Sequence, residues 1–291
     1  MLNQLQEKKY PLTNDPLFKA VFGQENEKSK YLLKELLNAL LHLQGEQRIK
    51  ELTHRNPFSI AESYTEKETI FDIKVVLENG DQVDIEMQVE AKQSYRKRSL
   101  FYWSKLHSKQ PIKGQNYENT VKSICINIVN SRCIRESDDA HSVFRVLEDK
   151  KHFLLCDDLE IHYFQLPNLR GIIELSKAEI DEEAWLLFIR DVGRKTMDEI
   201  NKLITSREVL KMAYDVYNKL NEDELMLEKL EAHEKYIMDR ETGLAIAKRE
   251  GREEGAKEKQ IEIAKNLLDI LDDQTIALKT GLTIEEVHKL R

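Results

Sequence analysis

The sequence has few of the features that mark secreted, membrane or disulfide-rich proteins. It contains three cysteines, an odd number without the paired spacing of a metal site, so we expect reduced thiols. It has no run of about 18 apolar residues, the length that a membrane-spanning helix needs. The first ten residues, MLNQLQEKKY, lack the apolar stretch of a signal peptide. We therefore expect a cytoplasmic protein without a membrane partner.

Charge is what the sequence has in quantity. Charged residues make up 34% of the chain and aromatic residues only 7%, which suits long exposed helices. The net charge of −8 argues against a protein that coats DNA without selectivity. Between residues 92 and 122, however, eight basic residues stand against the single acid Glu118: Lys92, Arg96, Lys97, Arg98, Lys105, Lys109, Lys113 and Lys122. This stripe fits the binding of a polyanion, or an ordinary solvated helix face.

Local patterns predict an order of helices and strands. Asp15 before Pro16 predicts a helix with Asp15 as its N-cap, and leucines at helical spacing predict a second helix over about 27–42. A further helix is expected over about 94–110, before Pro111 and Gly114. Apolar runs predict strands at 121–130, 151–156 and 161–166. Together with a hairpin described below, this order predicts an α/β or α+β fold.

From about residue 176 the composition becomes helical and highly charged. Spaced glycines in 239–271 weaken an isolated helix there. Thr283 followed by Glu286 three residues later predicts a capping box at the start of the last helix. We divide the chain into three parts, 1–175, 176–240 and a charged tail 241–291 with two short terminal helices.

Two strand-like runs flank Asn79-Gly80 and alternate between apolar and polar residues. The apolar positions are Phe71, Ile73, Val75, Leu77, Val83, Ile85, Met87 and Val89. The polar positions are Asp72, Lys74, Glu78, Gln82, Asp84, Glu86 and Gln88. This period of two predicts a hairpin with one buried face and one face toward water.

The turn decides which acids of this hairpin meet. A two-residue turn at Asn79-Gly80 would pair Asp72 with Met87 and separate Asp72 from Glu86. A three-residue loop, Glu78-Asn79-Gly80 with Gly80 in the left-handed conformation, pairs Asp72 with Glu86 and Lys74 with Asp84. Only the second arrangement puts all the apolar side chains on one face, so we predict it.

Paired carboxylates on one sheet face predict a metal site. Cβ atoms of directly opposed residues lie about 4.5–5.5 Å apart, and two carboxylates at that separation need a cation or a shared proton. The histidines are scattered without metal spacing, and no His or Cys joins the cluster. Oxygen ligands favour Mg²⁺, with Mn²⁺ or Ca²⁺ as alternatives. Such an ion activates water and polarises a phosphodiester.

The same residues resemble the PD-(D/E)XK nuclease superfamily, and most closely its Rpn branch of recombination-promoting nucleases and transposases. The resemblance rests on Asp15, Phe18 and Lys19 near the start, on Asp72, and on Glu86-x-Gln88. Residues 98–117 are similar to the family's second-helix signature, and the C-terminal tail is also similar to that of the family. The resemblance covers nearly the whole chain.

The resemblance implies an α/β fold with a central mixed sheet flanked by helices, and a helical C-terminal region. It implies a nuclease domain over 1–175 that cleaves DNA. Asp72 and Glu86 would bind the metal, with the Met87 carbonyl a third ligand and Asp15 a further candidate. Gln88 replaces the usual Lys, so Lys74 is a candidate to supply the missing charge. Candidate DNA contacts are Arg98, Tyr102 and Gln110 on one helix, with Lys97 and Lys105.

Simpler roles remain open for several of these residues. Asp15 could only cap its helix, Lys74 could only pair with Asp84, and Tyr102 is expected to pack. At the level of function, a metal-dependent DNA endonuclease ranks first. A nuclease fold that binds DNA or oligomerises with weakened catalysis ranks second, and a helical interaction protein ranks third. The charged tail is a candidate for homo-oligomer formation.

Overall fold

The computed structural model describes residues 9–55, 72–90, 94–110, 117–169, 181–205 and 207–291. Phe71, Lys92, Pro111, Lys113 and Gly114, which entered the sequence argument, lie outside these residues. The chain forms two compact units, Met1–Glu231 and Ala232–Arg291, each with its own core. None of the described helices combines the length and hydrophobicity that a membrane span requires.

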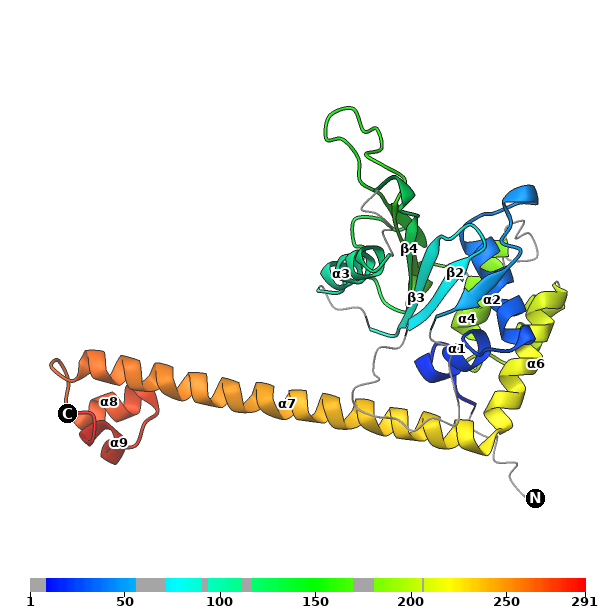
Figure 1. The fold of residues 1–291 in the computed structure, drawn as a ribbon. Coiled ribbons are helices and arrows are strands. Elements are labelled where there is room, and N and C mark those ends of the chain that lie inside the picture. The colour runs from blue at the N-terminus through cyan, green and yellow to red at the C-terminus, as the bar shows by residue number, and fades with distance from the viewer. Residues whose placement is uncertain (1–8, 56–71, 91–93, 111–116, 170–180, 206) are drawn as a thin grey trace, which may run out of the picture. The chain divides into compact units, whose positions relative to one another are not determined.

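A six-stranded mixed sheet forms the centre of the first unit (Figure 1). Its strands lie in the order β1-β2-β3-β4-β6-β5. The inner strands β3, β4 and β6 are parallel, and the remaining pairings are antiparallel. The bounds are β1 (Leu52–His54), β2 (Asp72–Leu77), β3 (Gln82–Gln88), β4 (Ser123–Val129), β5 (His141–Phe144) and β6 (Leu159–Gln165). With helices on both faces, this sheet confirms the predicted fold class.

One face of the sheet packs against most of the helices of the unit, to the right of the sheet in Figure 1. These are α1 (Asp15–Phe22), α2 (Glu27–Leu40), α4 (Asp181–Asp191), α5 (Met197–Ile204) and α6 (Glu208–Glu222). Ile73, Val75, Leu77, Val83, Ile85 and Met87 are buried in this core, as their alternation predicts. Val89 does not follow, because it lies beyond the end of β3 and is exposed.

The other face of the sheet is not open to water, contrary to the prediction. Helix α3 (Tyr95–Ser108) connects the parallel neighbours β3 and β4 and therefore crosses over this face. Its Tyr95, Trp103 and Leu106 pack with apolar residues of β4 and β6. Asp84 and Glu86 are consequently only 2% and 7% exposed. A crossover connection covers a face that a lone hairpin would leave wet.

Several predicted elements differ in the structure. Residues 151–156 form no strand: His152 has a positive φ of 56°, and the apolar side chains that follow it are exposed. The edge strand is β5 instead, which the sequence reasoning did not identify. At the start of α1 the N-cap is Asn14, and Asp15 is the first helical residue. The described residues of this unit also form short 3₁₀ turns, η1 (Gly45–Gln47), η4 (Tyr117–Asn119) and η5 (Leu166–Asn168).

The C-terminal elements are α7 (Glu224–Leu267), α8 (Asp273–Thr280) and α9 (Ile284–His288). Helix α7 is continuous over 44 residues despite its glycines. The predicted capping box is present at α9, where Thr283 and Glu286 bond each other's backbone N–H groups. The end of α7 and both short helices share a small core around Ile276 and Val287. The three-part division of the chain stays a prediction. Helices α4, α5 and α6, which belong to its second part, share one core with the sheet.

Candidate functional site

The loop of the β2–β3 hairpin has the predicted three-residue form. The Leu77 N–H donates to the Asp81 carbonyl at 2.9 Å, and the Gly80 N–H donates to the Leu77 carbonyl at 2.9 Å. Gly80 has a φ of +92°, a conformation that glycine adopts without steric cost. Glu78 accepts from the backbone N–H groups of Lys50 and Glu51, which holds the loop beside β1.

This loop sets the register of the candidate site. The Cα partner of Asp72 is Glu86, and that of Lys74 is Asp84. Positions 72, 74, 84 and 86 therefore share one face of the sheet, the face that α3 covers. On this face the two strands carry three acids and one lysine.

Arg98 of α3 brings a cation to Glu86. Its Nη2 donates to Glu86 Oε2 at 3.1 Å and to Gln88 Oε1 at 2.8 Å. The guanidinium lies over the rings of Tyr95 and Tyr102, at 4.6 and 5.4 Å from their centres. Burial alone would lower the pKa of Arg98, but the Glu86 carboxylate and the two tyrosines raise it above its ordinary value. Arg98 is therefore a fixed positive charge at this site.

A polar network under α3 holds the base of this arrangement. The Tyr95 hydroxyl donates to Asn127 Oδ1 at 3.0 Å, and Asn127 Nδ2 donates to the His162 carbonyl at 3.0 Å. Ser99 contacts the Tyr163 hydroxyl. Burial, and then the charge of Glu86, raise the pKa of Tyr95 well above its usual value, so this hydroxyl stays protonated. The network fixes the first turns of α3, and with them Arg98, over β3, β4 and β6.

The residues proposed to contact DNA divide into two groups. Lys97 and Lys105 are exposed on α3, and Tyr102 is half-buried beneath Arg98, as its expected packing role requires. Gln110 is different, because it lies beyond the end of α3 and is buried. Its side chain accepts from the Val121 N–H at 2.9 Å and donates to the Val121 carbonyl at 2.7 Å. Gln110 ties the entry of β4 in place, which corrects its assignment as a DNA contact.

Other members of the basic stripe have acidic partners. Arg96 donates to Glu136 at 2.7 Å, and Lys122 lies 3.1 Å from both Asp157 and Glu160. The stripe is therefore not one uniform basic surface. Among the lysines of the stripe that the structure describes, Lys97, Lys105 and Lys109 are exposed, and Lys97 and Lys105 are the predicted contacts with a phosphate backbone.

The remaining residues of the predicted site, including the candidate metal ligands, belong to different elements. The Met87 side chain is buried in the core on the other face of the sheet from α3, so its backbone carbonyl is the candidate metal ligand. Asp15 is buried at the first residue of α1, and Lys74 is half-buried on β2. For the backbone of Asp72 the structure gives the register described above. A metal-ligating role for these groups stays a prediction.

A family model described as PD-(D/E)XK nuclease family transposase matches residues 12–247. The chain belongs to this family. No curated protein and no solved structure matches it. The match spans the whole sheet, α3 and the helices on the opposite face, so it includes every residue of the candidate site in this PD-(D/E)XK protein. It supports a nuclease-like function, with DNA as the substrate that a nuclease of this family implies.

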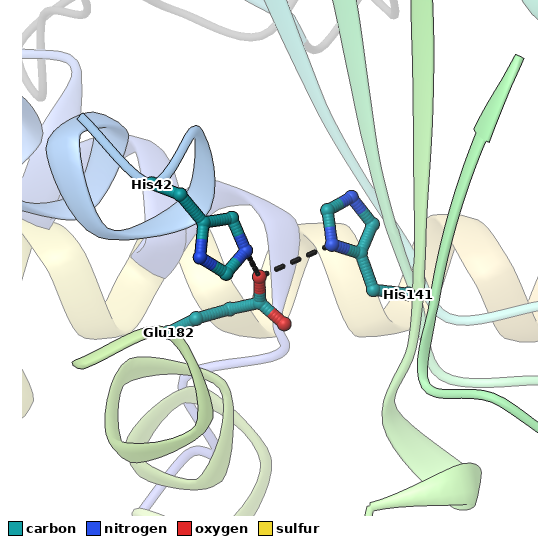
Figure 2. Close-up of side chains that lie close together, drawn as sticks. All are labelled: His42, His141 and Glu182. Atoms are coloured by element: carbon teal, nitrogen blue, oxygen red, sulfur yellow. Dashed lines mark ion pairs between the residues drawn. The ribbon is translucent and has the colours of Figure 1, made fainter. Parts of the chain in front are cut away.

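Sequence reasoning missed a second group of side chains on this PD-(D/E)XK fold (Figure 2). Among the described residues, His42, His141 and Glu182 converge closely enough to hold a metal ion, with their ligand atoms all within 4.8 Å of one another. Both imidazoles contact the same oxygen, Glu182 Oε2. The three residues come from the end of α2, the start of β5 and the first turn of α4. No sequence spacing connects them, so only the fold shows this cluster.

Proposed function

We propose that this protein is a divalent-metal-dependent DNA endonuclease, linked to recombination or mobile elements, in which Asp72 and Glu86 hold Mg²⁺. The observation that carries the proposal is the Asp72–Glu86 cross-strand pairing inside a chain of the PD-(D/E)XK transposase family. Glu86 is nearly buried beside Arg98, and each further negative charge on this covered face needs a cation of its own.

The residues on this face suit a hard cation. Asp72, Asp84 and Glu86 bring three negative charges, while Lys74 and Arg98 bring two positive ones, which leaves a balance of one negative charge. Carboxylate oxygens are the ligands that Mg²⁺ and Mn²⁺ prefer. Bound there, the ion would supply an activated water and polarise the phosphodiester.

Arg98 and Gln88 together replace the usual lysine in this proposal. Arg98 provides the positive charge that Gln88 lacks, and its planar guanidinium suits a phosphate oxygen. Gln88 accepts from Arg98 through its carbonyl oxygen, so its NH₂ group is the part that would donate to a water or a phosphate oxygen. Lys97 and Lys105, both exposed on α3, would contact the DNA backbone outside the cleavage centre.

Cleavage of plasmid DNA by the full chain tests the proposal. With Mg²⁺ or Mn²⁺, Glu86→Gln should lower the nicking rate by more than about 100-fold, because it removes a charged metal ligand. Glu222→Gln, the same change at an exposed position of α6, should cut at the rate of the unmodified protein. Circular dichroism should show the same helix content for all three proteins. Undiminished cutting by Glu86→Gln would refute the assignment.

The second candidate is a DNA-binding protein of the same fold with weakened catalysis, and it is favoured by Gln88 at the usual lysine position. It predicts metal-independent DNA binding without cleavage under any divalent ion. If that binding survives deletion of residues 245–291, the α3 surface would carry recognition. If it is lost, the C-terminal helices would carry recognition.

A further inference from the structure

The cluster of His42, His141 and Glu182 lies on the opposite face of the sheet from Glu86. His141 is the Cα partner of Phe164, which belongs to the large core beneath α1, α2 and α4. Glu86 is paired through β4 with Asn127 and Tyr163, under α3. Successive residues of a strand point to opposite faces, so the two sites are separated by the sheet itself.

The cluster is compact enough for a three-ligand zinc site, because its three ligand atoms lie within 4.8 Å of one another. His141 Nδ1 lies 3.1 Å from Glu182 Oε2, and His42 Nε2 contacts the same oxygen. Zinc–nitrogen and zinc–oxygen bonds of about 2.0–2.2 Å place ligand atoms of a tetrahedral site roughly 3.4 Å apart. The two imidazole rings are nearly parallel, 5.9 Å apart between centres (Figure 2). Two histidines and one glutamate are a ligand set that zinc uses when one position is left open.

His42 is held in a conformation that few residues adopt. It follows α2 with a φ of +54°, and its N–H donates to the Ala39 carbonyl at 3.2 Å. A non-glycine residue in the left-handed region is strained, and such residues gather at functional sites. The conformation directs the His42 imidazole to Glu182, while the ring stays half exposed.

The second ring nitrogen of His141 is bound in the way that metal-ligating histidines require. His141 Nε2 lies 3.0 Å from His162 Nδ1, and His162 Nε2 lies 3.7 Å from Glu160 Oε2. If Nδ1 of His141 binds a metal, the proton of His141 is on Nε2, which donates to Nδ1 of His162. The proton of His162 is then on its Nε2, which faces Glu160. If Nδ1 instead donates a proton to Glu182, neutral His162 must turn a lone pair toward the Glu160 carboxylate. The metal-bound tautomers therefore suit this chain of contacts better than a neutral His141 that donates to Glu182.

A cavity of about 650 Å³ adjoins the cluster, and His42, His141 and His162 belong to its lining. Three cations, Arg48, Lys122 and Arg145, line the same cavity together with four acids, Glu46, Glu78, Asp81 and Glu160. Lys122 and Arg145 are both paired with Glu160. We propose that His42, His141 and Glu182 form a Zn²⁺ site whose fourth position opens toward this cavity and accepts water.

Isothermal titration of the tag-free full chain with ZnCl₂, in buffer containing excess Mg²⁺, tests the proposal. The decisive variant is His42→Asn, because asparagine tolerates the left-handed conformation but removes the imidazole. The matched control is His152→Asn, an exposed histidine at nearly the same φ outside the cluster. We expect the unmodified protein and His152→Asn to bind one zinc ion with equal affinity. His42→Asn and Glu182→Gln should bind it more than about 100-fold more weakly.

Two further measurements keep the result specific. Cobalt absorption in the visible range should appear with the unmodified protein and be lost in His42→Asn, which reports the ligand set rather than affinity alone. The Glu86→Gln variant should bind zinc as tightly as the unmodified protein, since the carboxylate site lies on the other face. Equal zinc affinity in His42→Asn and His152→Asn would overturn the proposal. So would a failure of the unmodified protein to bind zinc, whatever the outcome of the cleavage assay.

Discussion

Arg98 joins three parts of the candidate site through a single side chain. One guanidinium nitrogen bonds both Glu86 and Gln88, and the plane of the group packs on Tyr95 and Tyr102. A lysine ammonium can also donate to two acceptors, but it lacks the planar shape and cannot stack on the two rings in the same way. The shape of the group therefore matters as well as its charge.

The Arg98→Lys substitution should lower the rate of DNA cleavage by about tenfold, equal to the loss of one charge-assisted hydrogen bond. Arg96→Lys is its matched control, because Arg96 lies on the same helix, is exposed and pairs with the exposed Glu136. That control should stay within about twofold of the unmodified rate. Equal losses in the two variants would show that the contacts of Arg98 with Glu86, Gln88 and the two tyrosines have no special role.

Residue identity alone explained some of these roles but not others. Arg98, Lys97 and Tyr102 were named as candidate DNA contacts, with packing as the expected role of Tyr102. The contact of Arg98 with Glu86 was not predicted, and Lys74 was named for the missing charge instead. Gln110 was misassigned because its position next to α3 in the sequence does not show that its side chain is buried. That burial follows from its hydrogen bonds with the backbone of Val121 at the entry of β4.

The β2–β3 hairpin depends on the conformation of Gly80. With φ at +92°, any residue with a Cβ atom is strained at this position, although an added Cβ would meet only Val121 at 3.5 Å. Gly80→Ala should therefore lower the free energy of unfolding of the first unit by about 1–2 kcal/mol. Urea denaturation measures this change, and the weaker loop should also reduce DNA cleavage because the Asp72–Glu86 pairing depends on it.

Gly251→Ala provides a contrast of opposite sign. Gly251 lies inside α7, and an added Cβ there would have no heavy atom within 4 Å. Alanine is a better helix former than glycine by roughly 0.8–1 kcal/mol, so this variant should stabilise the helix. If Gly80→Ala were neutral while Gly251→Ala stabilised α7, the argument from the left-handed loop would be wrong.

The two units of the chain use the same capping device in separate cores. Thr196 and Glu199 form a capping box at α5 in the first unit, and Thr283 and Glu286 form one at α9 in the second. Hydrogen bonds from the Thr283 backbone, from Lys257 and from the Thr283 hydroxyl lower the pKa of Glu286 to about 2. Similar bonds from Thr196 lower the pKa of Glu199.

A carboxylate with a lowered pKa stabilises the folded state above its unfolded pKa of 4.5, and this stability is lost as the pH falls toward about 2. Amide hydrogen exchange should therefore show α8 and α9 losing protection over that interval. Glu286→Gln should lower their protection already at pH 7 and flatten the pH response, while α5 is unchanged. Glu199→Gln should lower the protection of α5 and leave that of α8 and α9 unchanged. A joint response of both units to either variant would contradict two independent cores.

The sequence by itself determined the features that depend on neighbouring residues. Alternation and the position of Gly80 are local, so they predicted the hairpin, its three-residue loop and the Asp72–Glu86 pairing. The Thr283–Glu286 capping box is local for the same reason. Only the tertiary structure decided that α3 buries Glu86 and brings Arg98 to it. It alone brought His42, His141 and Glu182 together, because contacts between distant segments depend on how the chain crosses the sheet, and no short pattern records that path.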